Sequence, residues 1–333
     1  MKFIDIPASN QRDFINQYSD KTNINPVAVE KDWWVSAVMR ALFALPYADR
    51  MSFKGGTSLS KCWGLIERFS EDIDIAVDRD FLGFGGELSR TQVSDKLRRA
   101  ACTFVRETLQ KDLKAKMIEQ GIKEDKFSVE VKITPVTTTD PETIYIHYKS
   151  LFDATPYVVN IVKIEVSGRS MNEPLETVSL RSMLEDAYPS APFSEPSFNV
   201  PTVKPERTFL EKICLLHEEY SKDSSDIRCE RMSRHLFDIY KLGKAGIADR
   251  ALADRNLFKA IVEHRRKFIG LKGFDYGTLS PETICIVPPA AVYDMWKEDY
   301  ERMIEFMSYG EQPTFDEVIT YIKSLNDRLK AEL

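Results

Sequence analysis

The chain has 333 residues, of which 43% are hydrophobic, and its formal net charge is −6. A chain of this length can bury a large core and is long enough for two domains. Its net negative charge argues against tight, sequence-independent binding of nucleic acid by an overall basic surface. A local basic patch is compatible with this charge. The five cysteines are scattered and form no CxxC pair, which argues against a disulfide framework and a zinc cluster.

The N-terminus lacks the long apolar core of a signal peptide, and no apolar run approaches the length of a membrane span. Cysteines that are odd in number and unpaired are typical of reduced thiols. We therefore expect a soluble cytoplasmic protein with no membrane partner.

Residues 9–45 predict helices. Asn25-Pro26 is typical of a helix start, and apolar residues recur after it at roughly helical spacing. The run Glu30-Lys31-Asp32 lies on the same helix, and charge runs of this kind usually form a solvated face. We take residues 1–50 as an N-terminal helical segment.

Two aspartates one residue apart follow within an apolar run. Residues 51–54 predict a short strand, residues 58–66 a helix and residues 73–77 a second strand. Side chains alternate along a strand, so Asp72 and Asp74 are expected to project from the same face. Carboxylates that close repel each other unless a cation lies between them, and Mg²⁺ prefers one or two carboxylates plus substrate phosphate oxygens.

A glycine turn with hydroxyl side chains precedes the aspartates. Gly55 and Gly56 let the backbone approach a ligand closely, and Thr57 and Ser58 can donate N–H and O–H groups to phosphate. Together with the aspartates, this turn predicts a site for a metal-bound nucleoside triphosphate. The alternative is a strand edge with two surface aspartates, because Asp-x-Asp alone often occurs by chance.

A third carboxylate lies on a later strand. Residues 80–90 predict a loop, 92–120 a long amphipathic helix, and 127–136, 143–148 and 157–167 three strands. In the last strand Glu165 shares a face with Lys163. Beside the two aspartates, Glu165 would complete a two-metal site or act as a general base. The alternative is a surface glutamate paired with Lys163 or Arg169.

Prolines, serines and glutamates are frequent in residues 171–205, which predicts a domain boundary or a connecting hairpin. We therefore divide the rest of the chain into a core at 51–175 and a mainly helical domain at 176–333. Apolar residues at i, i+3 and i+4 spacing predict the helices of this second domain. These helices are expected at 206–220, 230–242, 250–268, 289–307 and 314–333. The last of them begins at Pro313-Thr314-Phe315-Asp316-Glu317, which resembles a capped helix start.

Two of these helices carry candidate functional residues. Lys212 lies on an apolar helix, where a lysine usually snorkels to solvent, but its ammonium could instead meet the β- or γ-phosphate. Asp238 follows Arg234 by four residues, so an ordinary helical ion pair is the alternative to a functional role. His235 has only a weak claim to a role as a metal ligand.

Six segments, taken in this order, resemble the AbiEii-type nucleotidyltransferase toxins of the DNA polymerase β-like superfamily. The segments are VEKDWW at 29–34, FKGGTSLSK at 53–61, RFSEDIDI at 68–75, KIEVS at 163–167, RTFLEK at 207–212 and RHLFDIY at 234–240. The resemblance covers about residues 29–242, and the remaining C-terminal residues match no motif. The combination of segments is fairly specific, whereas any single one is not.

The resemblance implies an α/β (α+β) fold, with a polymerase β-like nucleotidyltransferase core built on a mixed sheet and a helical C-terminal domain. The active site would lie in a cleft between them. Site residues are carried over by position. Those expected to bind nucleotide are Gly55, Gly56, Thr57, Ser58, Lys61, Arg68 and Lys212. Those expected to be catalytic are Asp72, Asp74, Glu165, Lys212 and Asp238, of which Asp72, Asp74 and Glu165 hold Mg²⁺ or Mn²⁺.

The implied activity is Mg²⁺-dependent transfer of a nucleoside monophosphate from an NTP to an acceptor hydroxyl, with tRNA or another RNA as acceptor. Members of the family are typically the toxin of a bacterial toxin–antitoxin or abortive phage-infection system. Their partner is commonly a winged-helix antitoxin encoded beside the toxin. The chain departs from many related enzymes in the longer spacing from Gly56 to Asp72 and in having glutamate as the third acid, which leaves the acceptor geometry open.

Two other functions compete with this one. The same chemistry could act on a small molecule or a protein hydroxyl, which the acidic composition mildly favours. A non-catalytic NTP-binding interaction module would bind triphosphate without releasing pyrophosphate, and the intact acids argue against it. A cluster of Lys and Arg beside Asp72 would favour RNA. The candidates for it are Lys54, Lys61, Arg68, Arg98, Arg99, Lys163 and Arg169.

Overall fold

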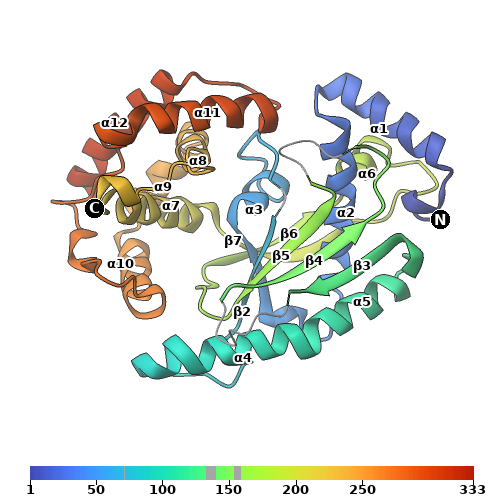
Figure 1. Cartoon of the computed structure of the whole chain (residues 1–333), viewed down its shortest axis with the longest axis horizontal. Coiled ribbons are helices and arrows are strands. Elements are labelled where there is room, and N and C mark those ends of the chain that lie inside the picture. The colour runs from blue at the N-terminus through green and yellow to red at the C-terminus, as the bar shows by residue number, and fades with distance from the viewer. Residues whose placement is uncertain (71, 133–139, 154–158) are drawn as a thin grey trace. The chain divides into compact units, whose positions relative to one another are not determined.

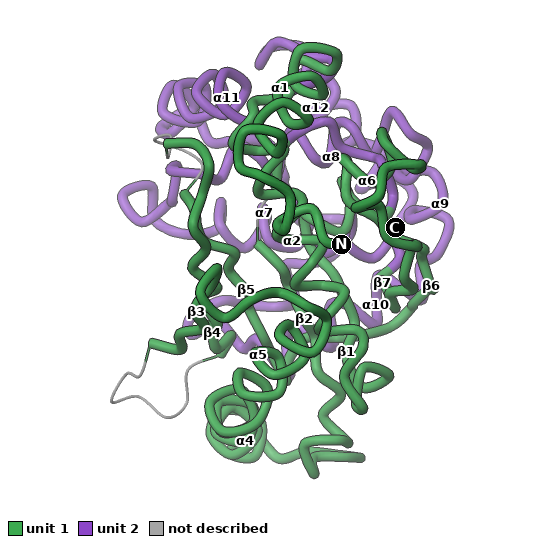
Figure 2. The backbone as a smooth tube through the Cα atoms, turned by 90° about the vertical axis from the view of Figure 1, so that its right-hand side faces the viewer, with its two compact units in different colours: residues 1–62, 69–203 green, residues 63–68, 204–333 purple. Residues whose placement is uncertain are grey.

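The computed structural model describes residues 1–70, 72–132, 140–153 and 159–333. The chain forms two compact units (Figure 2). Unit 1 comprises residues 1–62 and 69–203, and unit 2 comprises residues 63–68 and 204–333. The chain therefore leaves unit 1 after residue 62, contributes a short segment to unit 2, and returns to unit 1 at residue 69.

Unit 1 is built on a seven-stranded sheet with the order β3-β4-β5-β2-β1-β7-β6 (Figure 1). The pairs β2–β5 and β1–β7 are parallel, and the other neighbouring strands are antiparallel. This arrangement confirms the predicted mixed sheet. The strands are β1 (Met51–Lys54), β2 (Asp72–Val77), β3 (Phe127–Val131), β4 (Glu142–Tyr148), β5 (Ile161–Ser167), β6 (Leu175–Leu180) and β7 (Phe198–Val203).

The last two strands lie in the stretch that was predicted to begin the helical domain. β6 and β7 pair with each other, and β7 joins the sheet beside β1. The boundary between the units therefore follows Val203 rather than residue 175. The predicted strand residues 133–136 and 157–158 lie outside the described residues.

The helices of unit 1 come from the N-terminal segment and from the connections between strands. They are α1 (Ala8–Thr22), α2 (Pro26–Leu42), α3 (Gly55–Lys61), α4 (Arg98–Thr103), α5 (Gln110–Glu119) and α6 (Met183–Ala187). Two π-helical segments at Gln92–Leu97 and Phe104–Leu109 flank α4, so residues 92–119 form one helical stretch, as predicted. Short 3-10 helices lie at Phe3–Asp5, Ala48–Arg50 and Glu124–Lys126.

One face of the sheet is apolar and covered by helices. Ile73 and Ile75 of β2 and Ile164 of β5 are completely buried. α2 and α4 contact β5, and α5 contacts β3. Since side chains alternate along each strand, the polar residues of β2 and β5 belong to the opposite face. The core of unit 1 thus leaves one face of the sheet for chemistry.

The charge run on α2 is not the solvated face that was predicted. Glu30, Lys31 and Asp32 are each at most 3% exposed. Glu30 accepts a hydrogen bond from the backbone N–H of Leu151 at 2.8 Å, and Lys31 donates to the backbone oxygen of Val159 at 2.8 Å. The prediction was wrong because the charged groups find partners on connections that are distant in the sequence. Burial without such partners would be costly.

Unit 2 is helical within the part of the chain that the structure describes. Its helices are α7 (Pro205–Tyr220), α8 (Arg234–Lys244), α9 (Ile247–Ala253), α10 (Arg255–His264), α11 (Tyr293–Met307) and α12 (Phe315–Glu332). Short helical turns lie at Ser224–Asp226, Arg265–Ile269, Tyr276–Thr278 and Ala290–Val292. α12 begins with the predicted cap, in which Thr314 and Glu317 each accept a hydrogen bond from the other's backbone N–H.

The segment 63–68 is held within unit 2 by its own contacts. The backbone N–H of Tyr309 donates to the carbonyl of Glu67 at 3.1 Å, and Arg68 forms a β-bridge with Ser308. The Glu67 carboxylate pairs with Lys241 of α8 at 2.6 Å. Across the described residues of both units, no helix combines the length and the apolarity needed to cross a membrane.

Candidate active site

Asp72 and Asp74 lie on β2, between β1 and β5. Both side chains are half-buried, whereas Ile73 between them is fully buried, so the aspartates share the polar face of the sheet as predicted. In the sheet register, Asp74 lies opposite Lys54 of β1 on one side and Glu165 of β5 on the other. Neighbouring strands are about 4.8 Å apart, which brings these two carboxylates onto adjacent positions of one face.

Glu165 is engaged by a lysine on its own strand. It forms an ion pair with Lys163, which lies opposite Asp72 in the parallel register. Burial acts to lower the pKa of Lys163, but its hydrogen bond to Glu165 and the charges of Asp72 and Glu165 raise it above its usual value. Lys163 is therefore a fixed cation beside the acids. The pairing is one of the two that the sequence offered as an alternative to metal binding.

The donor set fits a divalent cation that also binds substrate. Among the described residues, no group of three or more His, Cys, Asp or Glu side chains is placed to hold a metal ion. Mg²⁺, however, is commonly held by one or two carboxylates together with phosphate oxygens and water. Asp72 and Asp74 meet this requirement, while Glu165 as a third ligand stays a prediction. The neighbouring Glu71 lies outside the described residues.

Gly55 brings the backbone directly against the Asp74 carboxylate. Its φ is +79°, and a Cβ atom at this position would lie 2.1 Å from Oδ2 of Asp74. Glycine is required here for two reasons, since other residues avoid this backbone conformation and any side chain would collide with the carboxylate. The glycine turn and the second aspartate therefore form one structural unit.

Gly55→Ala is expected to lower nucleotide transfer by about a hundredfold, because a misplacement of roughly 1 Å near a reacting group has effects of that size. Gly83→Ala is the matched control, since Gly83 has a similar φ of +83° but nothing within 4 Å of its would-be Cβ. Both variants should lose about 1–2 kcal/mol of stability from backbone strain. Urea unfolding and incorporation of α-labelled nucleotide measure the two effects. Equal activity losses would contradict a special role for Gly55.

The hydroxyls of Thr57 and Ser58 point into the protein. Both residues are completely buried. Thr57 donates to the carbonyl oxygen of Asp72, and Ser58 donates to the carbonyl oxygen of Gly55 at 2.8 Å. These hydroxyls therefore fix the turn and the start of β2. The backbone N–H groups of the first turn of α3 have no partner within the helix, and they are the groups from this segment that remain for phosphate.

Lys61, at the end of α3, forms an ion pair with Asp32 of α2, and both side chains are at least nine-tenths buried. Asp32 also accepts a hydrogen bond from the backbone N–H of Met183 at 2.7 Å. The ammonium group of Lys61 is thus committed to holding α3 against α2. Its assignment to nucleotide binding stays a prediction.

The remaining predicted residues come together in unit 2. Nε and Nη2 of Arg68 donate to the two carboxylate oxygens of Asp238, each at 2.7 Å. Nζ of Lys212 lies 2.9 Å from Oδ2 of Asp238. Asp238 is fully buried, and Arg68 is 2% exposed. Arg68 was predicted to bind nucleotide, and this assignment stays a prediction; in the structure its guanidinium is a partner of Asp238.

A single carboxylate lies between the two cations of this cluster. Burial alone would raise the pKa of Asp238, but the adjacent Arg68 and Lys212 hold it well below its usual range. Burial also lowers the pKa of Lys212, which Asp238 opposes. His235 has a pKa far below its usual value because of burial and the nearby cations. It is therefore neutral at pH 7, and its Nδ1 lies 3.2 Å from Nζ of Lys212.

Sequence spacing had offered Arg234 as the partner of Asp238, because the two residues are one helical turn apart. The partners Arg68 and Lys212 come instead from two other segments, and no local pattern links them to Asp238. The same holds for Asp32 and Lys61. In each case the available signal in the sequence was a charged residue among the apolar residues of a helix. Such a residue is buried when the helix packs, and a buried charge needs a partner.

Comparisons with known proteins give one family and a set of similar structures. The model of the family described as "Nucleotidyl transferase AbiEii toxin, Type IV TA system" matches residues 37–321. MenT4, the nucleotidyltransferase toxin Rv2826c from Mycobacterium tuberculosis H37Rv, is 16% identical with a TM-score of 0.52, over 96% of this chain and 88% of its own. JHP933 from Helicobacter pylori is 17% identical with a TM-score of 0.42, over 92% of this chain and 93% of its own. No curated protein matches in sequence.

Proposed function

Because the chain belongs to the AbiEii family of nucleotidyltransferase toxins of type IV toxin–antitoxin systems, we propose that it transfers a nucleoside monophosphate from an NTP to an acceptor hydroxyl with the help of Mg²⁺. In this reaction the acceptor oxygen attacks the α-phosphorus, a new phosphodiester bond forms, and pyrophosphate leaves. The observation that carries the proposal is the pair Asp72 and Asp74 on one sheet face, with Gly55 packed against the second carboxylate.

The residues of this face have separable tasks in the proposed reaction. Asp72 and Asp74 supply carboxylate oxygens for the cation, and the turn at Gly55-Gly56 presents backbone N–H groups to the phosphates. Lys54 and Lys163 lie in register with Asp74 and Asp72, respectively, and place positive charge on either side of β2. A bound Mg²⁺ supplies charge neutralisation on the triphosphate and lowers the pKa of the attacking hydroxyl.

Positioning and fixed charge carry most of the catalysis in such transfers. We propose that the acceptor oxygen is deprotonated at this face, with Glu165, which forms an ion pair with Lys163, as a candidate base. For Lys212 we propose a role in nucleotide binding. Asp238 would then act as a positioning residue, since it holds the Lys212 ammonium at 2.9 Å.

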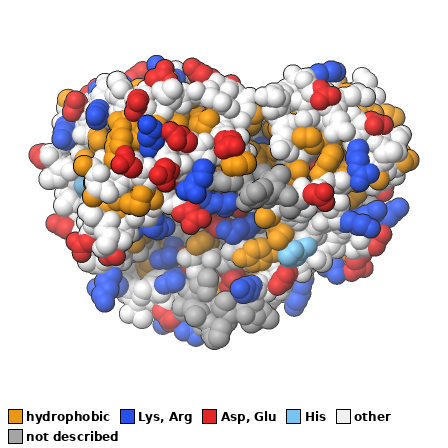
Figure 3. Space-filling view, turned by 45° about the horizontal axis from the view of Figure 1, so that its top comes forward, with side chains coloured by type: hydrophobic (Ala, Val, Ile, Leu, Met, Phe, Trp, Pro, Cys, Tyr) orange, Lys and Arg blue, Asp and Glu red, His pale blue; other side chains and the backbone are white. Residues whose placement is uncertain are grey.

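The acceptor we propose is RNA, with tRNA as the leading candidate. Residues 90–116 contain eight Lys and Arg residues and three Asp and Glu residues, in a chain of net charge −6. Four of these cations, Arg90, Lys96, Arg99 and Lys111, are exposed. Basic and acidic side chains are interspersed on the face shown in Figure 3, so the net charge does not form one continuous acidic surface there. This stretch packs on the face of the sheet opposite to the acids, so it supports binding of an anionic macromolecule by unit 1, while Lys54 and Lys163 are the cations in register with the acids.

Incubation of the protein with each α-labelled NTP and total cellular RNA is expected to label a fraction of small RNA. Mapping of the label should place the added nucleotide at 3′ ends. If the label appears only in protein or only in a small-molecule fraction, the acceptor is a protein or a small molecule and not RNA. Bound triphosphate without any release of pyrophosphate would instead favour a non-catalytic module.

We also propose that the protein acts in the bacterial cytoplasm as the toxin of a phage-defence system. Its counterpart would be a winged-helix antitoxin encoded in the neighbouring gene. Membership of a type IV toxin family supports such a partner. Growth inhibition on expression of the protein alone, relieved by co-expression of the neighbouring gene, is the corresponding test.

A further inference from the structure

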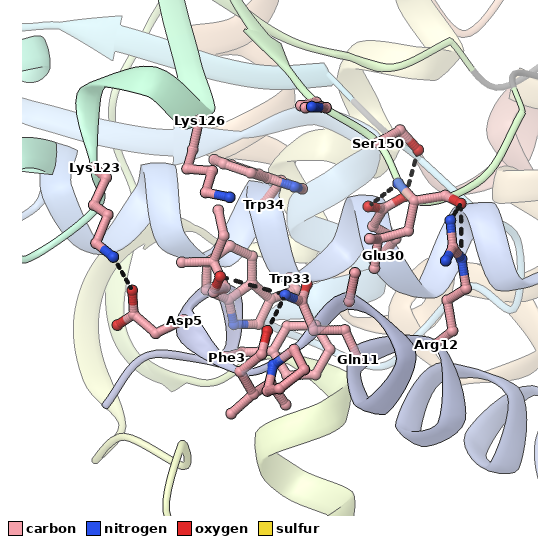
Figure 4. Close-up of a pocket in the computed structure, with 16 residues that line it drawn as sticks. Phe3, Asp5, Gln11, Arg12, Glu30, Trp33, Trp34, Lys123, Lys126 and Ser150 are labelled. Atoms are coloured by element: carbon pink, nitrogen blue, oxygen red, sulfur yellow. Dashed lines mark hydrogen bonds and ion pairs between the residues drawn. The ribbon is translucent and has the colours of Figure 1, made fainter.

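A pocket of about 420 Å³ lies within unit 1. Figure 4 shows its walls, which come from the N-terminal residues, α1, α2 and the ends of β3 and β4. Its volume is within the range of about 300–1,000 Å³ that small-molecule sites occupy. Phe3, Trp33 and Trp34 are at most 4% exposed and form an apolar floor.

This pocket lies on the other side of the sheet from the acids. The ring of Trp34 stacks on that of Tyr148 of β4, with centroids 4.8 Å apart and an interplanar angle of 19°. Tyr148 is two residues from Ile146 on β4, so both side chains belong to the helix-covered apolar face. Asp72 and Asp74 project from the opposite face. The sheet therefore separates the pocket from the acids, although Trp33 and Trp34 belong to the VEKDWW segment that resembles the family.

Two of the lysines that line the pocket lie at neighbouring strand ends. The backbone N–H of Lys149 donates to the carbonyl of Lys126 at 3.3 Å, directly beyond the cross-strand pair Phe127 and Tyr148. Like charges placed opposite each other on paired strands are destabilising. Neither ammonium group forms an ion pair with a carboxylate in the ranges that the structure describes, whereas the nearby Lys123 pairs with Asp5 at 3.8 Å. An anion between Lys126 and Lys149 would remove this repulsion.

The turn after Lys149 is fixed from two helices. Glu30 of α2 accepts hydrogen bonds from the backbone N–H of Leu151 and the hydroxyl of Ser150, and Arg12 of α1 donates to the carbonyl of Leu151 at 3.0 Å. Burial raises the pKa of Glu30, and the hydrogen bonds from Ser150 and Leu151 oppose that shift. Both carboxylates of the pocket, Glu30 and Asp5, therefore already have partners. The ammonium groups of Lys126 and Lys149 therefore remain for a ligand, and the turn beside them is already fixed by Glu30 and Arg12.

We propose that this pocket is a second ligand site and that it takes a small organic phosphate. The phosphate lies between the ammonium groups of Lys126 and Lys149, as lysines bind phosphate through charge. The apolar part of the ligand lies against the floor formed by Phe3, Trp33 and Trp34. A free phosphate ion has the same charge chemistry but no apolar part, so the floor distinguishes the two.

The test uses the full-length protein in EDTA, with adenosine 5′-monophosphate as the probe and tryptophan fluorescence as the signal. The monophosphate is expected to bind, and the double variant Lys126→Glu/Lys149→Glu should weaken its affinity by at least about tenfold, since two attractive charges become repulsive. The matched control is Lys21→Glu/Lys132→Glu, which reverses two exposed lysines elsewhere in unit 1 and should leave the affinity unchanged. Inorganic phosphate should bind more weakly than the nucleotide.

A second variant keeps the test decisive if the double charge reversal fails to fold. Ala8 lines the pocket and is exposed, so Ala8→Trp fills the space without disturbing the core. It should abolish binding of the monophosphate. The proposal is overturned if no binding occurs at millimolar concentration, if inorganic phosphate binds as tightly as the nucleotide, or if Asp72→Asn removes binding while the pocket variants do not. The last result would assign the nucleotide to the acids instead.

Discussion

Asp74→Asn is expected to reduce nucleotide transfer by about a thousandfold or more, because a metal contributes several kcal/mol of charge stabilisation and each 1.36 kcal/mol is about a factor of ten in rate. The substitution keeps the size of the side chain and removes its charge. Gly55 packs against this side chain. Because the size of the side chain is kept, the charge is lost without a change in the turn. Initial rates with α-labelled nucleotide measure the effect, and Asp72→Asn should behave in the same way.

Asp125→Asn is the control for this loss, since Asp125 is an exposed aspartate at the turn before β3. It should retain full activity. Growth inhibition in cells provides a second readout, and the variants should rank by it in the same order as by nucleotide transfer. Transfer at the normal rate by Asp74→Asn, with Mg²⁺ present, would remove the aspartate pair from the mechanism.

Asp238→Asn is expected to lower the free energy of unfolding of unit 2 by about 3–5 kcal/mol, the usual cost of leaving buried charges without their counter-ion. Both Arg68 and Lys212 would lose their carboxylate partner inside a site that is fully buried at its centre. Urea unfolding measures the effect. Asp249→Asn is the control, because Asp249 pairs with Arg328 at the surface, where ion pairs contribute about 0–1 kcal/mol.

The same carboxylate makes the stability of unit 2 sensitive to acid. The pKa of Asp238 is held below its ordinary value by Arg68 and Lys212, against the effect of burial. Its contribution is therefore complete above about pH 4, the unfolded pKa of an aspartate, and is lost as the pH falls towards the folded-state pKa. Asp238→Asn should remove this part of the acid sensitivity. An equal cost for Asp238→Asn and Asp249→Asn would contradict the proposed network.

Local patterns in the sequence predicted most of the elements. Alternation fixed the face of Asp72 and Asp74 on β2, and the Thr314 cap marked the start of α12. The order of the motifs predicted the nucleotidyltransferase family, which the family match confirms. These features depend on residues a few positions apart, and short-range stereochemistry is sufficient to specify them.

Pairings between distant segments could not be predicted in this way. Glu30, Lys31 and Asp32 resemble a solvated charge run unless the connections that bind them are known. Thr57 resembles a phosphate ligand until its hydroxyl is found on the carbonyl of Asp72. In each case the residue type is correct for a ligand site, and tertiary contacts determine which group it binds.

The excursion of residues 63–68 into unit 2 limits how the protein can be divided or recombined. A fragment that starts at residue 204 lacks the Arg68 guanidinium that neutralises Asp238. A fragment that ends at residue 203 retains Glu67 without Lys241 and Tyr309. The helices of unit 2 are therefore not a domain that can be separated from residues 63–68. An exchange of this region between related toxins preserves the fold only if the segment between α3 and β2 is inherited along with the helices.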